Sequence, residues 1–336
     1  MKKKTPLYHL VTFWIIFIGS LVHAAEFDNV FKLIKIIKLE QKDDLLIGSV
    51  RDCLITDDYI YICDSKSGNV KIYNKDGKFY SLLGKKGSGP GEFVTPFALT
   101  IAEDKIYAGD LIARKLTVFD KNSHQYQNDF YILDIKEIKV WNNRIYISYS
   151  DLTTNTMLHS FDIKGQKQND LIRIPPISKK NNLISDNISF DIDTNGNIYL
   201  VHEMSNYIYH IHSNMKLDSL PFQSSNYTPP PENPVDISKG REHVLKWIKS
   251  WTHVLKIDYL EKSDVLLIYL SDTEGNFLDI YDSAGRPLNT GIYTDYRYLY
   301  SNADENFYFL EEDDQSATLE LRIKQYQLIK KQNISH

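Results

Sequence analysis

An all-β fold is predicted by three features of the 336-residue sequence. Aromatic and β-branched residues, including 23 Tyr and 15 Phe, are abundant, which is typical of pleated, half-buried strands. Related short motifs recur six times, and the last copy lacks a strand that the N-terminal region can supply. Together these observations predict a six-bladed β-propeller, closed by an N-terminal strand in the last blade and carrying one Pro-rich, partly helical insertion.

The first 24 residues predict a secretory signal peptide. Lysines at positions 2–4 precede an apolar run over 7–22, and cleavage is expected after Ala24. An uncleaved membrane anchor is the alternative, although the run is short for a membrane span. We therefore expect an exported protein, periplasmic or secreted, with no transmembrane segment in the mature chain. No cysteine follows the apolar run, which predicts that the protein is not a lipoprotein.

The net charge argues against nucleic acid as a partner. The charge is −5 for the whole chain. Residues 1–24 hold three lysines and no acidic residue, so their removal changes it to −8. A general nucleic-acid binder would instead carry a basic stripe.

Six tyrosine-containing strands mark the repeats. Their central residues are Tyr61, Tyr107, Tyr146, Tyr199, Tyr269 and Tyr308. The intervals between them are 46, 39, 53, 70 and 39 residues, and all but the 70 are close to the length of a four-stranded blade. The blades are expected at about 45–84, 93–132, 133–175, 183–222, 253–293 and 295–330.

The remaining segments complete this prediction. The strand at 30–40 has no unit of its own, and pairing it with the last blade removes the open edges of the ring. The interval of 70 contains an insertion at 223–252, where four prolines interrupt strand pairing. A short amphipathic helix ending near Trp251 is expected within it.

A glycine-rich stretch, GKKGSGPGEF at 84–93, is expected to join two blades. A phosphate-binding loop would lead into a helix N-terminus, whereas Gly91 is followed by Pro96 and β-forming residues. We expect glycines with positive φ in this joint and Phe93 filling the space between the blades.

The joint and the blade after it, residues 78–120 with the motif KIYAGD, resemble a known family. They are similar to the exported six-bladed β-propellers of Bacteroides-type bacteria that are related to NHL-repeat propellers. The resemblance is specific over about 45–125 and fades in the later blades. It implies the fold and export, and little chemistry, since the family is known for its fold rather than for one activity.

The cysteines, Cys53 and Cys63, flank a turn at Asp57-Asp58. If the hairpin is centred on this turn, they lie opposite each other on neighbouring strands, close enough for a disulfide in an oxidising compartment. Two reduced, buried thiols are the alternative.

Three histidines are candidate metal ligands: His202, His210 and His212, with Glu203 nearby. If their hairpin turns near Ser205, all three can share one face and bind a divalent metal such as Zn or Ca. Solvated histidines explain the alternating pattern equally well.

Aspartates that follow the central tyrosine by three residues, Asp64, Asp110 and Asp272, can be interpreted in two ways. They either form a ring of cation ligands or cap the turn after each strand. Their repetition at equivalent positions favours the capping role.

Aromatic residues in and after the insertion are candidate ligand-binding residues: Tyr227, Trp247, Trp251 and Tyr296. Flat aromatic rings suit sugar or peptide ligands, although interblade packing uses most aromatics of a propeller.

The sequence contains no G-x-S-x-G, H-E-x-x-H or paired C-x-x-C motif, so no catalytic residues and no cofactor are expected. The function predicted is a non-catalytic, exported binding or scaffolding protein for a peptide, glycan or protein partner. The alternative is a metal-dependent lyase or hydrolase with its site in the central channel, because one fold supports many activities.

Overall fold

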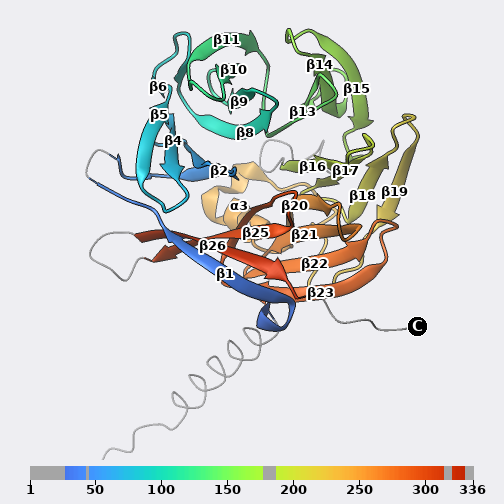
Figure 1. The fold of residues 1–336 in the computed structure, drawn as a ribbon. Helices are drawn as coiled ribbons and strands as arrows, with labels where there is room; N and C mark the ends of the chain where they lie inside the picture. Colours follow the sequence, from blue (N-terminus) through green and yellow to red (C-terminus); the bar gives the residue numbers. More distant parts are fainter. Residues whose placement is uncertain (1–26, 43–44, 177–186, 314–319, 330–336) are drawn as a thin grey trace, which may run out of the picture.

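The computed structural model of the protein describes residues 27–42, 45–176, 187–313 and 320–329, so the predicted signal peptide lies outside the described residues. Six four-stranded antiparallel sheets surround a common centre (Figure 1). This arrangement is a six-bladed β-propeller and confirms the predicted fold class.

The first three blades each follow the chain from an inner to an outer strand. The first contains β2 (Val50–Ile55), β3 (Tyr59–Asp64), β4 (Asn69–Asn74) and β5 (Phe79–Leu83). The second contains β8 (Pro96–Ala102), β9 (Lys105–Asp110), β10 (Lys115–Asp120) and β11 (Tyr126–Tyr131). The third contains β12 (Glu137–Trp141), β13 (Arg144–Asp151), β14 (Thr156–Asp162) and β15 (Lys167–Arg173).

Blades four and five repeat this order, and the sixth takes its outer strand from the N-terminal region. The fourth contains β16 (Ile188–Ile192), β17 (Ile198–His202), β18 (Tyr207–Ile211) and β19 (Leu217–Pro221). The fifth contains β20 (His253–Leu260), β21 (Val265–Ser271), β22 (Asn276–Asp282) and β23 (Pro287–Thr294). The sixth contains β24 (Arg297–Ser301), β25 (Asn306–Asp313), β26 (Glu320–Leu328) and β1 (Phe31–Lys38).

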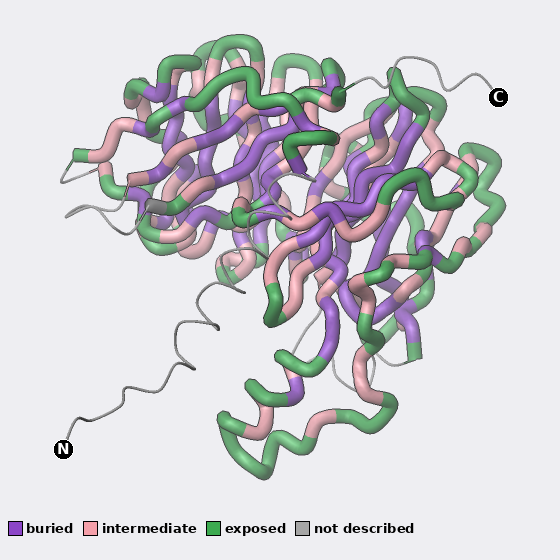
Figure 2. The backbone as a smooth tube through the Cα atoms, turned by 90° about the horizontal axis from the view of Figure 1, so that it is seen from below, coloured by how far each residue is buried: buried purple, intermediate pink, exposed green. Residues whose placement is uncertain are grey.

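The hydrophobic core is divided among the spaces between adjacent blades. Six clusters of buried apolar side chains each join two neighbouring blades. For this reason the second strand of a blade is buried on both faces: in β3 and β9 every residue after the first is buried, whereas β11 has no buried residue. Figure 2 shows the buried backbone inside the sheets and the exposed backbone at their turns.

Closure of the ring depends on β1, which pairs antiparallel with β26 from Phe31–Leu328 to Lys38–Arg322. Phe31 is almost fully buried and packs edge-on against Phe307, with 5.1 Å between the ring centroids. The N-terminal strand therefore contributes both backbone hydrogen bonds and core side chains to the last blade, as predicted.

The glycine-rich stretch is a joint between the first two blades. Its ends, β6 (Lys85–Lys86) and β7 (Glu92–Phe93), form a short parallel pair. Gly84 has φ 69°, and a Cβ there would lie 2.5 Å from the Phe93 ring, which is fully buried between the blades. The positive φ and the buried phenylalanine agree with the prediction.

The insertion projects from one face of the ring as a loop, a short helix and a second loop (Figure 2). It contains η2 (Ile237–Lys239) and α3 (Arg241–Ile248). The chain leaves the insertion directly into β20, the inner strand of blade five. The insertion therefore stands on the face at which the inner strands begin.

Candidate ligand-binding site at the mouth of the central channel

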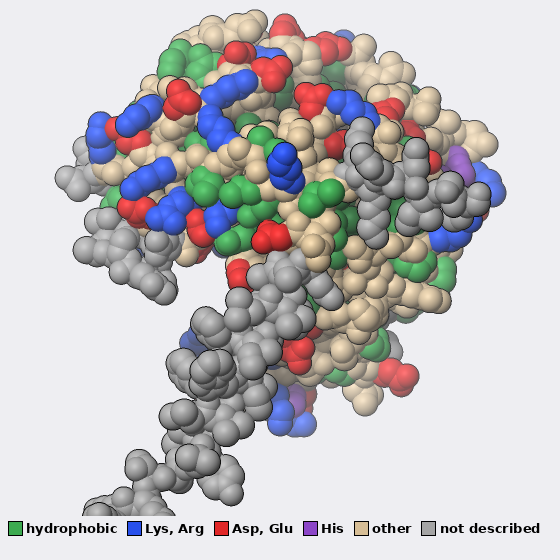
Figure 3. Space-filling view, turned by 60° about the horizontal axis from the view of Figure 1, so that its bottom comes forward, with side chains coloured by type: hydrophobic (Ala, Val, Ile, Leu, Met, Phe, Trp, Pro, Cys, Tyr) green, Lys and Arg blue, Asp and Glu red, His purple; other side chains and the backbone are tan. Residues whose placement is uncertain are grey.

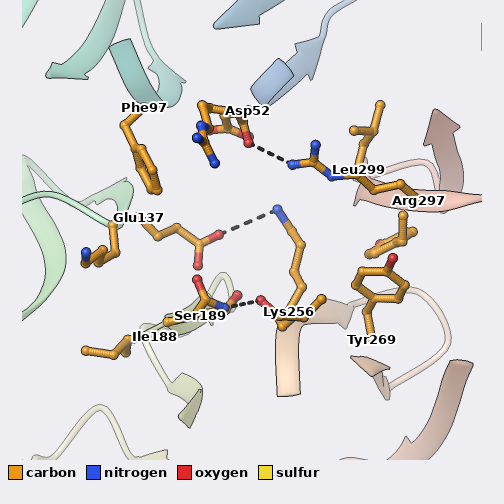
Figure 4. Close-up of a pocket in the computed structure, with 14 residues that line it drawn as sticks. Asp52, Phe97, Glu137, Ile188, Ser189, Lys256, Tyr269, Arg297 and Leu299 are labelled. Carbon is orange, nitrogen blue, oxygen red and sulfur yellow. Dashed lines mark hydrogen bonds and ion pairs between the residues drawn. The ribbon is translucent and has the colours of Figure 1, made fainter. Parts of the chain in front are cut away.

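A cavity of about 320 Å³ opens where the inner strands of all six blades begin. Its lining consists of Arg51, Asp52, Phe97, Lys136, Glu137, Asn187, Ile188, Ser189, Leu255, Lys256, Tyr269, Arg297, Tyr298 and Leu299. Figure 4 shows Phe97 and Lys256 pointing into the cavity from opposite sides. A concave, mixed polar and apolar space of this size lies at the lower end of the range for small-ligand sites, about 300–1,000 Å³.

Carboxylates on the inner strands hold neighbouring blades together. Four of them accept a hydrogen bond from a backbone N–H of the next blade's inner strand. These pairs, with the carboxylate first, are Asp52–Leu99 (2.7 Å), Glu137–Phe190 (2.8 Å), Asp191–Tyr259 (3.0 Å) and Asp258–Ser301 (2.9 Å). Tyr300 plays the corresponding part between blades six and one, because its hydroxyl accepts from the N–H of Ile55 at 2.7 Å.

Further along the inner strands, one ion pair and one hydrogen bond join buried or half-buried charged and polar side chains. Lys139 lies 3.0 Å from Asp191, and the Tyr298 hydroxyl donates to Asp258. Burial raises the pKa of Asp258, and Lys256 and Lys139 oppose this rise. Burial tends to lower the pKa of Lys139, but Asp191, Glu137 and Asp258 outweigh it and hold the pKa above the ordinary value for lysine. Lys139 therefore remains charged at neutral pH.

The cavity lining carries an excess of positive charge. It contains four cations, Arg51, Lys136, Lys256 and Arg297, and only two carboxylates, Asp52 and Glu137. Glu137 also lies 3.7 Å from Lys256. The outer surface in Figure 3 instead mixes acidic and basic side chains, and the whole chain has a net charge of −5. A local positive field on an acidic protein favours an anionic ligand.

Two of these cations lie near the ring of Phe97. The Arg51 guanidinium carbon and the Lys136 ammonium lie 5.8 Å and 5.9 Å from the centre of its ring. Cation–π attraction at these distances positions both charged groups beside the ring. Arg51, Phe97 and Lys136 come from three different blades. No sequence motif predicted that these three side chains lie together.

The structure does not bring the three candidate histidines together. In the pairing of β17 with β18, Tyr199 is opposite His210, so the hairpin is centred one half-residue before Ser205. This shift puts His202 on one face of the blade and His210 on the other. His210 lies between Tyr199 and His212, and His212 contacts Asp218 at 2.7 Å. Among the described residues, no group of three ligand-type side chains is placed to hold a metal ion.

The same kind of shift separates the cysteines. Cys53 pairs with Ile62, so Cys63 points to the opposite face of the blade. Cys53 lies in the cluster between blades six and one, and Cys63 in the cluster between blades one and two. Both are free, buried thiols, so of the two alternatives the structure has the reduced pair and not the possible disulfide between Cys53 and Cys63.

The candidate aromatic residues are distributed over separate places. Trp247 and Trp251 pack edge-on against each other and, with Met204, form the small core that attaches the insertion to blade four. They are only 9% and 1% exposed, so both indoles serve mainly as packing residues of the insertion. Tyr227 is half-buried against the cluster between blades four and five. Tyr296 accepts a hydrogen bond from Lys324 in blade six at 2.6 Å. A ligand-binding role for these four residues stays a prediction.

The recurring aspartates cap turns. Asp110, for example, is fully buried and accepts backbone N–H bonds from Val94, Thr95, Ile112 and Ala113. Asp64 has an equivalent set of bonds, and Asp272 accepts from two backbone N–H groups of its own turn. The capping interpretation is the one that the structure supports.

The fold is a six-bladed propeller with a cationic cavity at the mouth of its central channel. The chain matches the family described as a domain of unknown function, DUF4934, over residues 20–334, and it belongs to that family. No curated protein sequence matches the chain. Within the described residues, no helix is long and apolar enough to cross a membrane.

Solved structures share the fold at low identity. A protein of Bacteroides fragilis assigned as exported is 14% identical, with TM-score 0.67 over 90% of this chain and 96% of its own. A DUF4221 family member from Bacteroides vulgatus is 11% identical, with TM-score 0.70 over 90% and 99%. Virginiamycin B lyase from Staphylococcus aureus is 13% identical, with TM-score 0.54 over 89% and 100%.

Proposed function

We propose that this protein is an exported, periplasmic or secreted binding protein that holds a peptide, a glycan or a partner protein at the mouth of its central channel. The cavity to which all six inner strands contribute carries this proposal. The predicted signal peptide supports export, and so does the structural similarity to a Bacteroides protein assigned as exported.

The use of the carboxylates supports binding over catalysis at this site. Asp52 and Glu137 both accept backbone N–H bonds from the next blade, and Glu137 also lies 3.7 Å from Lys256, so both carboxylates have a role in holding the blades together. Apart from these carboxylates, the cavity lining offers a ligand mainly cations and the aromatic ring of Phe97. Such a set recognises charge and shape.

The alternative, a metal-dependent lyase or hydrolase, has a direct test. Purified protein is dialysed and its zinc and calcium content measured by mass spectrometry. Stoichiometric metal that survives dialysis would favour the alternative, whereas binding of a ligand that is unchanged by chelator supports the proposed function.

The central experiment screens the mature chain, residues 25–336, against glycan and peptide arrays and, by pull-down, against extracellular proteins. The Phe97→Ala variant is compared with Tyr131→Ala, which removes a 69% exposed aromatic from the outer strand β11. We expect Phe97→Ala to weaken binding about tenfold, because an aromatic contact at the centre of an interface is often worth more than about 1 kcal/mol. Equal binding by both variants would contradict a site at the mouth.

A further inference from the structure

In the described part of the chain, two arginines at the mouth make hydrogen bonds to neutral groups only. Among the described residues, neither Arg51 nor Arg297 lies in an ion pair. Arg51 donates to the Ser65 hydroxyl at 3.3 Å, and Arg297 donates to the carbonyls of Val50 and Arg51 at 2.9 and 3.2 Å. Lys136 is only loosely paired, 3.6 Å from Asp134. A guanidinium that donates to neutral groups keeps its full charge for a ligand carboxylate.

The rest of the lining suits a hydroxylated ring. Asn187 donates its amide N–H to the carbonyl of Leu255 at 2.6 Å, which fixes the side chain at the wall of the cavity. Ser189 is held there by the N–H of Ile257 at 3.2 Å. Phe97 adds an aromatic face to these amide and hydroxyl groups. A few fixed polar groups beside an aromatic surface are what orient a small ligand in a pocket.

An extended peptide has less to bind here. Peptides that bind to sheets commonly add a strand to an open edge through backbone hydrogen bonds. The inner edges of blades two, four, five and six already have backbone N–H groups bonded to carboxylates of their neighbours, at Leu99, Phe190, Tyr259 and Ser301. Each of these bonds occupies a backbone N–H that an added peptide strand would need, so strand addition is less favourable at these edges.

We propose that the ligand at the channel mouth is an acidic sugar, with its carboxylate bound by Arg51 and Lys136 and its ring placed against Phe97. This inference rests on the proposed function and deepens it by naming the ligand class. A cavity of about 320 Å³ limits the bound part to a compact unit, such as the terminal uronic acid of an oligosaccharide.

The test is calorimetric titration of the mature chain with trisaccharides of galacturonate, glucuronate and mannuronate, each compared with its methyl ester. The ester keeps the ring and hydroxyls and removes the charge. We expect at least one acid to bind about tenfold more tightly than its ester, and binding to weaken as salt is raised.

Two matched double variants test whether the preference for the acid over its ester depends on the cations at the mouth. Arg51→Gln/Lys136→Gln removes two cations from the mouth, and Arg144→Gln/Lys105→Gln removes two from the starts of β13 and β9, at the opposite face of the ring. The first pair is expected to lose the preference for the acid, whereas the control keeps it. Thermal unfolding of both variants checks that the fold is retained.

The failures of the two proposals are distinguishable. Acid and ester could bind with equal affinity, or acidic peptides alone could bind. If that binding is lost in Phe97→Ala, the acidic-sugar proposal is wrong and the proposed binding site still holds. Binding that Phe97→Ala leaves intact would overturn the site itself. Absence of binding by all three acids at millimolar concentration would also overturn the inference.

Discussion

Asp64 and Lys71 form the most deeply buried ion pair described in the molecule, with 2.7 Å between the carboxylate and the ammonium and almost no exposure of either side chain. Asp64 also accepts backbone N–H bonds from both sides of its turn. Burial tends to raise the pKa of Asp64, but Lys71, Ser67 and the backbone bonds outweigh it and lower the pKa. The stability from this lowered pKa is present at neutral pH and is lost as pH falls through the folded-state pKa.

We predict that Asp64→Asn lowers the free energy of unfolding by about 3–5 kcal/mol, because it leaves Lys71 buried without a countercharge. The control is Asp282→Asn, whose partner Arg286 is 81% exposed, and which should cost no more than about 1 kcal/mol. Denaturant unfolding measures both. The double variant Asp64→Asn/Lys71→Met should recover part of the loss, and equal costs for the two single variants would refute the account.

At the scale of elements, the insertion is attached to the ring through His253 at the start of β20. Its Nδ1 contacts Glu203 at 2.5 Å, and its Nε2 contacts the carbonyl of Ile248 at the end of α3 at 2.9 Å. Both partners are acceptors, so both bonds form together only when the imidazole carries two protons. Glu203 also accepts from the N–H of Asn187, which lines the cavity, so this contact connects the insertion with the binding site.

The attachment is predicted to weaken as pH rises. Burial tends to lower the pKa of His253, but Glu203 and the Ile248 carbonyl outweigh it and raise the pKa. A raised folded-state pKa gives stability that is fully present below the unfolded value of about 6.5 and is lost as pH rises through the folded-state pKa. Melting temperatures measured from pH 5 to 9 should therefore show the wild type losing its advantage over His253→Gln at high pH. His243→Gln on α3 is the control, and an advantage that stays constant with pH would disprove this role.

Hairpin register explains which parts of the site the sequence could predict. Three predictions depended on patterns of many residues, and all three were confirmed. They are the repeat of tyrosine strands, the spare strand at 30–40 and the joint at 84–93. The disulfide and the histidine set depended on hairpins centred on one residue, and both hairpins are shifted. Since side chains alternate between faces, such a shift moves one partner to the other side of the sheet.

The channel mouth could not be found from sequence because no local pattern marks it. Arg51, Phe97 and Lys136 are far apart in the chain and meet only because three blades converge on the axis. Most inner strands have a charged or polar residue at or next to their start, as at Arg51, Lys136 and Arg297, but this feature is too general to predict a site.

At the scale of the whole molecule, six similar interfaces between blades hold the inner strands around one central cavity. Each blade buries its middle strands against two neighbours, so the blades are held by six similar interfaces. Pairing of β1 with β26 completes the last blade. The closed ring fixes the inner strands, and their first residues are thereby positioned with little freedom around the mouth.

The measurement that tests the central claim most directly is a crystal structure of the mature chain with the ligand selected by the array screen. We predict that the ligand lies at the channel mouth, in contact with Arg51, Phe97 and Lys136, on the face of the ring that carries the insertion. A ligand bound on an outer strand or on the insertion alone, with the mouth unoccupied, would contradict the account.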